Sequence, residues 1–199
     1  MKVLVLDNYD SFTYNIVHIL RELGDLDISV IKNDIININE VQSFDKIILS
    51  PGPSLPKDAG KMNELISKYF DTKSILGICL GHQAIAENFG GKLYNMKEPL
   101  HGVQTDIYLD DDYIFKGIES EIKACRYHSW SVDNESFPQE LNIIAKDRDG
   151  VVMALSHKRF DLRGIQFHPE SIQTKSGFNM IQNFIKNKYE KLTSRFIQS

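Results

Sequence analysis

The stretch that decides the fold is SILGICLGHQAIAENFGG, residues 74–91. It opens with residues 74–78, a short apolar run of the kind expected of a buried strand. Residues 82–89 then carry apolar side chains at helical spacing, and two glycines follow them as a helix stop. The stretch therefore predicts a strand, a tight turn at Cys79 and a helix, which is the repeating unit of an α/β fold.

Two interpretations of Cys79 compete, a buried apolar thiol and a nucleophile. Free cysteine is among the most buried residue types, which favours the structural interpretation before the neighbours are considered. Gly77 and Gly81 flank Cys79 in the glycine-X-nucleophile-X-glycine pattern of a strained turn, where side chains would clash. The N-terminus of the following helix also favours a thiolate over a thiol. The neighbours thus favour a nucleophile.

Composition limits the classes of function. The chain has 199 residues, 42% of them hydrophobic and 25% charged, which is enough for a sizeable core and argues against disorder. The formal net charge of −4 gives no support for binding nucleic acid or an anionic membrane. Two cysteines argue against a disulfide framework and indicate a reducing, cytoplasmic location. No signal peptide is recognisable, and no apolar run approaches the roughly 18 residues of a membrane span.

The order of elements also predicts an α/β fold. Strands are expected at 2–6, 27–31, 46–50 and 74–78, and helices at 13–23, 59–70 and 82–89. We expect Asp58 or a neighbouring polar residue to cap the helix at 59–70. Shorter strands follow at 102–109, 121–127, 142–146, 151–157 and 162–167, with a helix at about 175–190. We predict one domain, residues 1–199, with a doubly wound, mostly parallel central sheet, flanking helices and a smaller mixed or antiparallel region.

A cysteine nucleophile needs a base, and the base needs an orienting group. Among the six histidines, His168 stands out because it follows a predicted strand, and strand ends are where active sites gather in open α/β sheets. Glu170 follows after one proline, and its carboxylate would orient the imidazole. We expect His82 to point away from the thiol and His18 to be a surface or packing residue. The alternative is a solvated turn that holds a histidine and a glutamate by chance.

A third element is the loop LSPGPSLPKDAG, residues 49–60. A loop rich in proline and glycine is often only a turn. This loop, however, follows a strand beside the predicted elbow, so the Gly52 N–H would face the same pocket. Together with the N–H of Leu80, it would form an oxyanion hole.

These motifs resemble a known family. GICLGHQ (77–83) and FHPES (167–171) resemble the triad signature of class I glutamine amidotransferases. DNYDSFTYN (7–15), LSPGP (49–53) and QFHPESIQTKSG (166–177) are similar to the glutaminase subunits of anthranilate synthase and aminodeoxychorismate (para-aminobenzoate) synthase. The resemblance covers essentially the whole chain and implies a flavodoxin-like fold.

The resemblance also implies residue roles. Cys79 would be the nucleophile, His168 the base and acid, and Glu170 the orienting carboxylate. The implied glutamine pocket consists of Gly52, Pro53, Ser54, Gln83 and the backbone of Ser129 and Trp130. Three positions depart from the family pattern: Ser54 replaces a glycine, Val103 a lysine and Trp130 a leucine. If position 54 needs a positive φ, Ser54 is strained there.

The implied activity is hydrolysis of the glutamine side-chain amide through a γ-glutamyl thioester at Cys79. The ammonia would pass to a separate chorismate-utilising synthase subunit. That subunit would make anthranilate for tryptophan biosynthesis, which we favour, or aminodeoxychorismate for folate biosynthesis, or one chain would serve both. The resemblance implies no cofactor or metal in this chain and places Mg²⁺ on the partner.

Two other classes of function are open. A stand-alone γ-glutamyl-type cysteine hydrolase would share the elbow and the histidine but would need no partner. A flavodoxin-like binding module would hold an FMN phosphate in the loop at residues 7–15. Asp7 and Asp10 disfavour the second class, because like charges repel.

Overall fold

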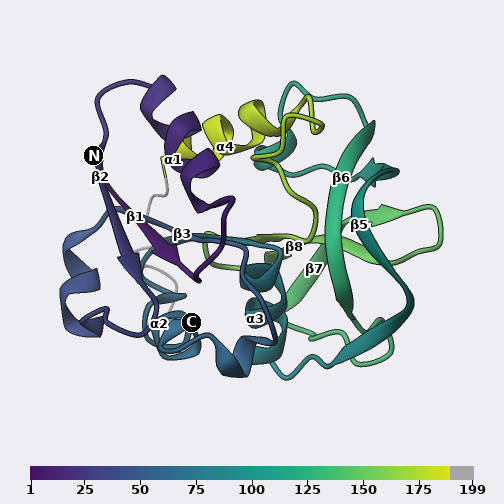
Figure 1. Ribbon diagram of the computed structural model, residues 1–199, viewed down its shortest axis with the longest axis horizontal. Helices are drawn as coiled ribbons and strands as arrows, with labels where there is room; N and C mark the ends of the chain where they lie inside the picture. Colours follow the sequence, from purple (N-terminus) through teal and green to yellow (C-terminus); the bar gives the residue numbers. More distant parts are fainter. Residues whose placement is uncertain (189–199) are drawn as a thin grey trace, which may run out of the picture.

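The computed structural model in Figure 1 describes residues 1–188. Its strands are β1 (Lys2–Asp7), β2 (Asp27–Lys32), β3 (Lys46–Leu49), β4 (Ser74–Ile78), β5 (Leu93–Leu109), β6 (Glu121–Val132), β7 (Leu141–Asp147), β8 (Val152–His157) and β9 (Leu162–Ile165). Its α-helices are α1 (Thr13–Glu22), α2 (Met62–Tyr69), α3 (Leu80–Asn88) and α4 (Gly177–Lys186). Short 3₁₀ turns lie at Ile38–Ser43, Pro56–Asp58 and Tyr113–Phe115.

The nine strands form one sheet in the order β2-β1-β3-β4-β9-β8-β7-β5-β6. The first five strands in this order run parallel, and the remaining pairings are antiparallel. The predicted fold class, a parallel sheet with an antiparallel region added to it, is confirmed. Because β1 lies between β2 and β3, successive strands are added first on one side of β1 and then on the other, and this reversal of strand order opens a crevice at the carboxyl ends of the parallel strands.

Helices cover both faces of the parallel part. Figure 1 shows α1 and α4 together on one side of the sheet, and α2 and α3 on the other. Alternate residues of β1 enter opposite cores: Val3 and Val5 pack on the α1 side, while Leu4 and Leu6 pack on the α2 side. Burying each such side chain stabilises the fold by about 1.5–3 kcal/mol. This alternation fixes which face of each strand meets which helix.

Several helix boundaries in the structure differ from the predicted ones. The helix predicted at 59–70 is α2, which begins at Met62; Asp58 lies in a 3₁₀ turn and does not cap it, and Lys61 occupies the N-cap without a side-chain bond. The C-terminal helix is α4, and residues 189–190 of its predicted range lie outside the described residues.

The antiparallel region departs most from the prediction. The strand predicted at 102–109 is β5, which begins at Leu93 and bends at two irregularities in its pairing with β6. One of them lies at His101–Val103, where Gly102 has a φ of 67°. Bulges increase strand twist and redirect side chains, and sequence periodicity does not reveal them.

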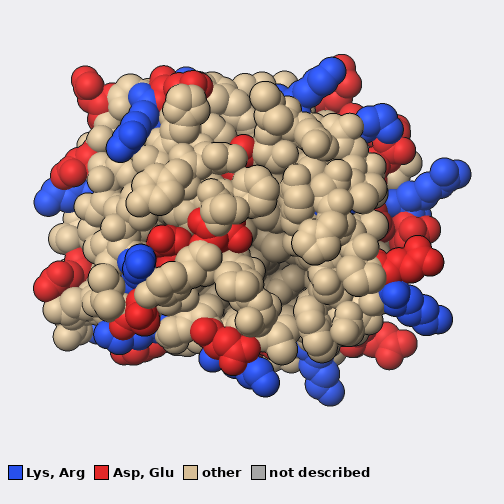
Figure 2. All heavy atoms as spheres, in the orientation of Figure 1, with Lys and Arg blue, Asp and Glu red and all other residues tan. Residues whose placement is uncertain are grey.

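Figure 2 shows one face of the molecule, with acidic and basic side chains mixed around its rim, a cluster of acidic side chains near its centre and a hollow beside that cluster. Among residues 1–188, no helix is long and apolar enough to cross a membrane.

Candidate active site

The predicted turn at Cys79 is present between β4 and α3. Cys79 has φ 51° and ψ −96°, which is a strained conformation for a residue with a side chain. Its N–H donates to the carbonyl of Ile165 over 2.7 Å, which ties the turn to β9. The thiol therefore lies at the carboxyl end of a central strand and at the N-terminus of a helix, whose dipole favours a thiolate.

The two flanking glycines are required by close backbone contacts. A Cβ at Gly77 would lie 2.4 Å from the carbonyl carbon of Gly81. A Cβ at Gly81 would lie 2.8 Å from Cβ of Leu49 on β3. Real Cβ atoms do not approach other heavy atoms this closely, so no larger residue fits at either position.

His168 and Glu170 form a buried pair just beyond β9. Nδ1 of the His168 ring lies 2.6 Å from Oε1 of Glu170. The backbone N–H of His168 donates to the backbone carbonyl of Cys125 over 2.9 Å. Because Nδ1 is engaged, only Nε2 is available for proton transfer. Within the described part of the chain, Nε2 has no hydrogen-bond partner.

The electrostatics of His168 link it to Cys79. Burial lowers the pKa of His168, but the Cys79 thiol and the Glu170 carboxylate outweigh burial and raise this pKa well above its usual value. A negative charge on either partner favours the imidazolium. The geometry therefore suits a thiolate–imidazolium pair oriented by a carboxylate.

A cavity of about 300 Å³ opens beside Cys79. Its lining includes every residue predicted for the oxyanion hole and the glutamine pocket: Gly52, Pro53, Ser54, Leu80, Gln83, Ser129 and Trp130. His101, Tyr127 and His128 complete the lining. This volume is at the lower end of the range for small-molecule sites, which suits a ligand the size of an amino acid.

The loop after β3 packs tightly against the elbow. A Cβ at Gly52 would lie 2.6 Å from Cδ2 of Leu80 and 2.7 Å from Cβ of Asn8, so only glycine fits. Ser54 has a φ of 65°. Position 54 therefore does adopt the left-handed conformation, and the serine that replaces the family's glycine is strained.

The polar side chains of the cavity are partly committed to one another. Nε2 of Gln83 donates to the carbonyl of Trp130 over 2.8 Å and to Oε1 of Gln166 over 3.1 Å. Both amide hydrogens of Gln83 are thus used, so only its Oε1 is left to accept a hydrogen bond from a ligand.

The sequence prediction missed three neighbours of the reacting groups. The rings of Phe12 and Tyr127 lie 5.4 and 5.1 Å from the ring of His168, and they shield it. Nε2 of Gln166 lies 3.6 Å from Sγ of Cys79. Phe12 and Gln166 belong to the quoted motifs, which was the available signal. For Tyr127, the only available signal was its position two residues before Ser129 and Trp130, whose backbone is predicted to line the glutamine pocket.

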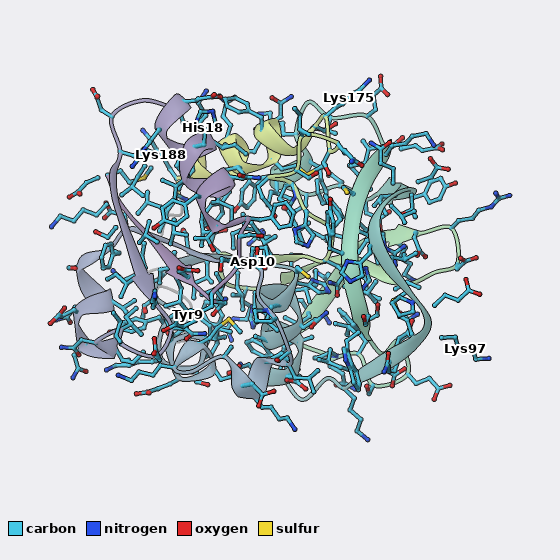
Figure 3. All side chains as sticks on the ribbon, viewed as in Figure 1. Tyr9, Asp10, His18, Lys97, Lys175 and Lys188 are labelled. Atoms are coloured by element: carbon cyan, nitrogen blue, oxygen red, sulfur yellow. The ribbon has the colours of Figure 1, made fainter. Side chains whose placement is uncertain are left out.

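The two rejected histidines lie elsewhere. His82 is buried against Gly164 of β9, and burial lowers its pKa to about 4. His18 is exposed on α1 and pairs with Glu22 over 3.0 Å; Figure 3 places it at the edge of the molecule. His18 was expected to be a surface or packing residue, and the structure shows that it lies on the surface.

The loop after β1 is built around its own carboxylate. Oδ1 of Asp7 accepts from the N–H of Tyr9 and from the hydroxyl of Thr13, both over 2.9 Å. These donors are therefore not free to bind a phosphate, which disfavours an FMN-binding module. Among residues 1–188, no group of three or more His, Cys, Asp or Glu side chains is placed to hold a metal ion.

Comparisons with known proteins identify the family of this chain. A family model described as glutamine amidotransferase class-I matches residues 4–188. The chain is 42% identical, over 92% of its length and 95% of the relative, to aminodeoxychorismate/anthranilate synthase component 2 of Bacillus subtilis. It is 43% identical to anthranilate synthase component 2 of Pyropia yezoensis, over 92% and 98% of the two chains.

A solved structure is similar as well. A Thermoplasma acidophilum protein provisionally assigned to GMP synthase superposes with a TM-score of 0.83 at 32% identity, over 93% of this chain and 92% of that one. Sequence and structure thus point the same way over nearly the full length. The chain belongs to the class-I glutamine amidotransferase family.

Proposed function

We propose that this protein hydrolyses the side-chain amide of glutamine and supplies the ammonia to a separate chorismate-utilising synthase subunit. The observation that carries the proposal is Cys79 on a strained turn, in electrostatic contact with His168 of the His168–Glu170 pair and open to a cavity that suits an amino acid. The domain would span residues 1–199.

The first half-reaction releases ammonia. The Cys79 thiolate attacks the amide carbon of glutamine, and the N–H groups of Gly52 and Leu80 hold the oxyanion. The C–N bond then breaks as His168 gives its Nε2 proton to the departing ammonia, which leaves a γ-glutamyl thioester. Glu170 holds the imidazole by its Nδ1 and stabilises the imidazolium.

The second half-reaction regenerates the thiolate. His168, now neutral, takes a proton from water as the water attacks the thioester carbon. Collapse of the tetrahedral intermediate breaks the C–S bond, releases glutamate and restores the thiolate–imidazolium pair. Gly52, Pro53, Ser54, Gln83, Ser129 and Trp130 hold the substrate glutamine throughout.

The identity of the synthase subunit determines which product the complex makes. One relative is named for both synthases and another for anthranilate synthase alone, which supports anthranilate as the main product and aminodeoxychorismate as the alternative or second product. Mg²⁺ belongs to the partner's chorismate site, and this chain needs no cofactor. Two unpaired, buried cysteines suit a reducing cytoplasm.

Glutamate release by the lone chain, compared with release after adding chorismate and a synthase subunit, tests the proposal. We expect weak hydrolysis alone and clear activation by the partner, because uncontrolled hydrolysis would waste glutamine. Full turnover by the lone chain, unchanged by the partner, would instead establish a stand-alone hydrolase.

A further inference from the structure

Gln166 lies between β9 and His168 and is fully buried. Its Nε2 is 3.6 Å from Sγ of Cys79, and its Oε1 accepts from Nε2 of Gln83. Cys79, which carries the nucleophilic sulfur, is only 6% exposed. A buried thiolate is unfavourable unless hydrogen-bond donors face it.

The direction of the Gln166 amide is fixed by a backbone carbonyl. The carbonyl of Trp130 can only accept, so the atom of Gln83 that faces it must be Nε2. The same Nε2 also contacts Gln166, so the Gln166 atom facing it must be Oε1. Nε2 of Gln166 is then the atom that faces the sulfur, and the contact has a donor pointing at Cys79.

A second chain of hydrogen bonds ends on the same carbonyl. Nε of Arg126 donates to Nε2 of His128 over 3.0 Å, and Nδ1 of His128 lies 2.9 Å from the Trp130 carbonyl. A guanidinium can only donate, so His128 must accept at Nε2 and donate from Nδ1. Burial and the charge of Arg126 lower the pKa of His128 to about 3, so the ring is neutral.

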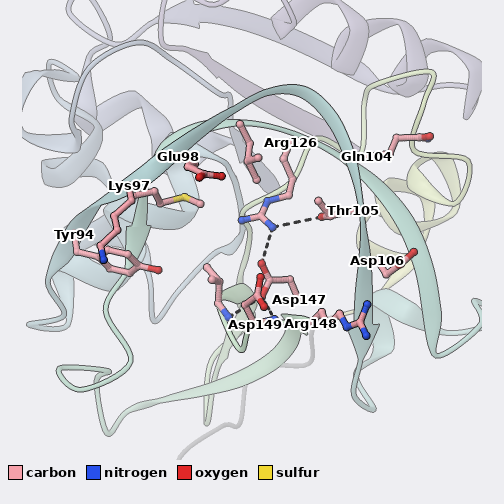
Figure 4. A pocket seen from close by; sticks show the side chains of 13 residues that line it. Tyr94, Lys97, Glu98, Gln104, Thr105, Asp106, Arg126, Asp147, Arg148 and Asp149 are labelled. Atoms are coloured by element: carbon pink, nitrogen blue, oxygen red, sulfur yellow. Dashed lines mark hydrogen bonds and ion pairs between the residues drawn. The ribbon is translucent and has the colours of Figure 1, made fainter.

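The far end of this chain is an ion pair. Nη1 of Arg126 lies 2.6 Å from Oδ2 of Asp147, and Figure 4 shows both side chains lining a cavity between β5, β6 and the turn after β7. The network thus runs from the Asp147–Arg126 ion pair through His128 and the Trp130 carbonyl to Gln83 and Gln166, and the ion pair and the carbonyl can each act in only one hydrogen-bonding direction. The amide of Gln166 cannot reverse without breaking several bonds at once.

We propose that Gln166 is a further catalytic residue, whose amide donates a hydrogen bond to the Cys79 thiolate. This inference rests on the proposed function, because it takes Cys79 as the nucleophile. The donor persists after His168 has given its proton to ammonia. It is therefore in place when the C–S bond of the thioester breaks and the thiolate is expelled.

The molecule offers a matched control. Sγ of Cys125 lies 3.6 Å from Oε1 of Gln173, the same distance as in the Cys79–Gln166 contact but with the amide oxygen facing the sulfur. An acceptor there stabilises the thiol, whereas a donor stabilises the thiolate. Gln173 is exposed and lies outside the cavity beside Cys79.

The test is the pH dependence of iodoacetamide alkylation, followed at each cysteine by peptide mass spectrometry. In Gln166→Met the midpoint for Cys79 should rise by about 1–2 pH units, the value of a hydrogen bond to a charged group. Gln166→Asn keeps an amide but withdraws it from the sulfur, so it should shift the midpoint in the same direction. Gln173→Met should leave the Cys79 midpoint unchanged.

The outcomes separate the two proposals. If Cys79 reacts rapidly in the natural sequence and its midpoint stays in place in both Gln166 variants, the role of Gln166 is overturned and the proposed function stands. If Cys79 reacts no faster than Cys125 at any pH, the assignment of the nucleophile fails, and this inference fails with it.

Discussion

The two cysteines of this protein occupy similar surroundings but differ in chemistry. Both are at least nine-tenths buried, and each has a glutamine amide 3.6 Å from its sulfur. Cys79 lies on a turn with a positive φ, whereas Cys125 lies within β6, and its N–H donates to the hydroxyl of Thr174. Burial alone therefore does not distinguish a nucleophile from a packing residue.

The difference lies in backbone conformation and in the polarity of the neighbours. The turn at Cys79 presents the thiol to a cavity and to His168. Cys125 contributes to the site through its backbone, because its carbonyl accepts a hydrogen bond from the backbone N–H of His168. One cysteine supplies a reacting atom, and the other supplies a fixed point for the base.

The largest expected effect separates the two thiols directly. Cys79→Ser should lower glutamine-dependent activity on the order of 10⁴-fold or more, because the nucleophile is lost. Cys125→Ser should change this activity little, since its thiol touches no reacting group. Synthesis by the complex with ammonium salt in place of glutamine should survive both changes. A loss of glutamine-dependent activity in Cys125→Ser alone would reverse the assignment.

A second comparison concerns the groups that serve Cys79. His168→Ala should nearly abolish glutaminase activity, because His168 moves protons in both half-reactions. Glu170→Ala should be roughly 100-fold less severe, because Glu170 only orients and stabilises the imidazole. Steady-state glutamate release by the complex measures both. If ammonium-dependent synthesis disappears as well, these residues are structural.

His82, in the helix after Cys79, should make the stability of the protein depend on pH. The pKa of this histidine is about 4 in the fold and about 6.5 when unfolded, so its contribution to stability is present above pH 6.5 and is lost as the pH falls toward 4. His168, with its raised pKa, contributes with the opposite sign. A variant must therefore isolate His82.

Between pH 7.5 and pH 5, His82→Leu should lose about 2 kcal/mol less stability than the natural sequence. This value follows because pH 5 lies about 1.5 units below the unfolded pKa. Urea unfolding at the two pH values gives the difference. Ile85→Leu, a buried substitution in the same helix that removes no titratable group, serves as the control and should keep the natural pH dependence. Equal losses in all three proteins would mean that His82 is not held neutral.

The smallest expected effect concerns the second strained residue of the cavity. Ser54→Gly should raise the free energy of unfolding by about 1 kcal/mol, because glycine adopts the left-handed conformation without the Cβ penalty. Ser54→Ala keeps the Cβ and should bring no such gain. Thermal or urea unfolding of both variants measures the strain. A gain in the alanine variant would point to the hydroxyl instead of the backbone.

Local sequence determined the parts of this protein that depend on local sterics and periodicity. Apolar runs and helical spacing marked the strands and helices, because burial follows the periods of 2.0 and 3.6 residues. The two glycines around Cys79 identified the elbow, since no other residue fits its close contacts. The single proline between His168 and Glu170 made a contact between their side chains one of two interpretations, and the resemblance of FHPES to the family's triad signature favoured it.

Only the tertiary structure decided which distant segments meet. Phe12, Tyr127 and Gln166 reach the reacting groups because the segments after β1 and β9 meet the middle of β6, and no local pattern encodes that meeting. The irregular start of β5 was missed because bulges arise from pairing between strands. The direction of the Gln166 amide depends on the carbonyl of Trp130, which is distant in the sequence, since hydrogen-bond polarity is set by whichever groups the fold brings into contact.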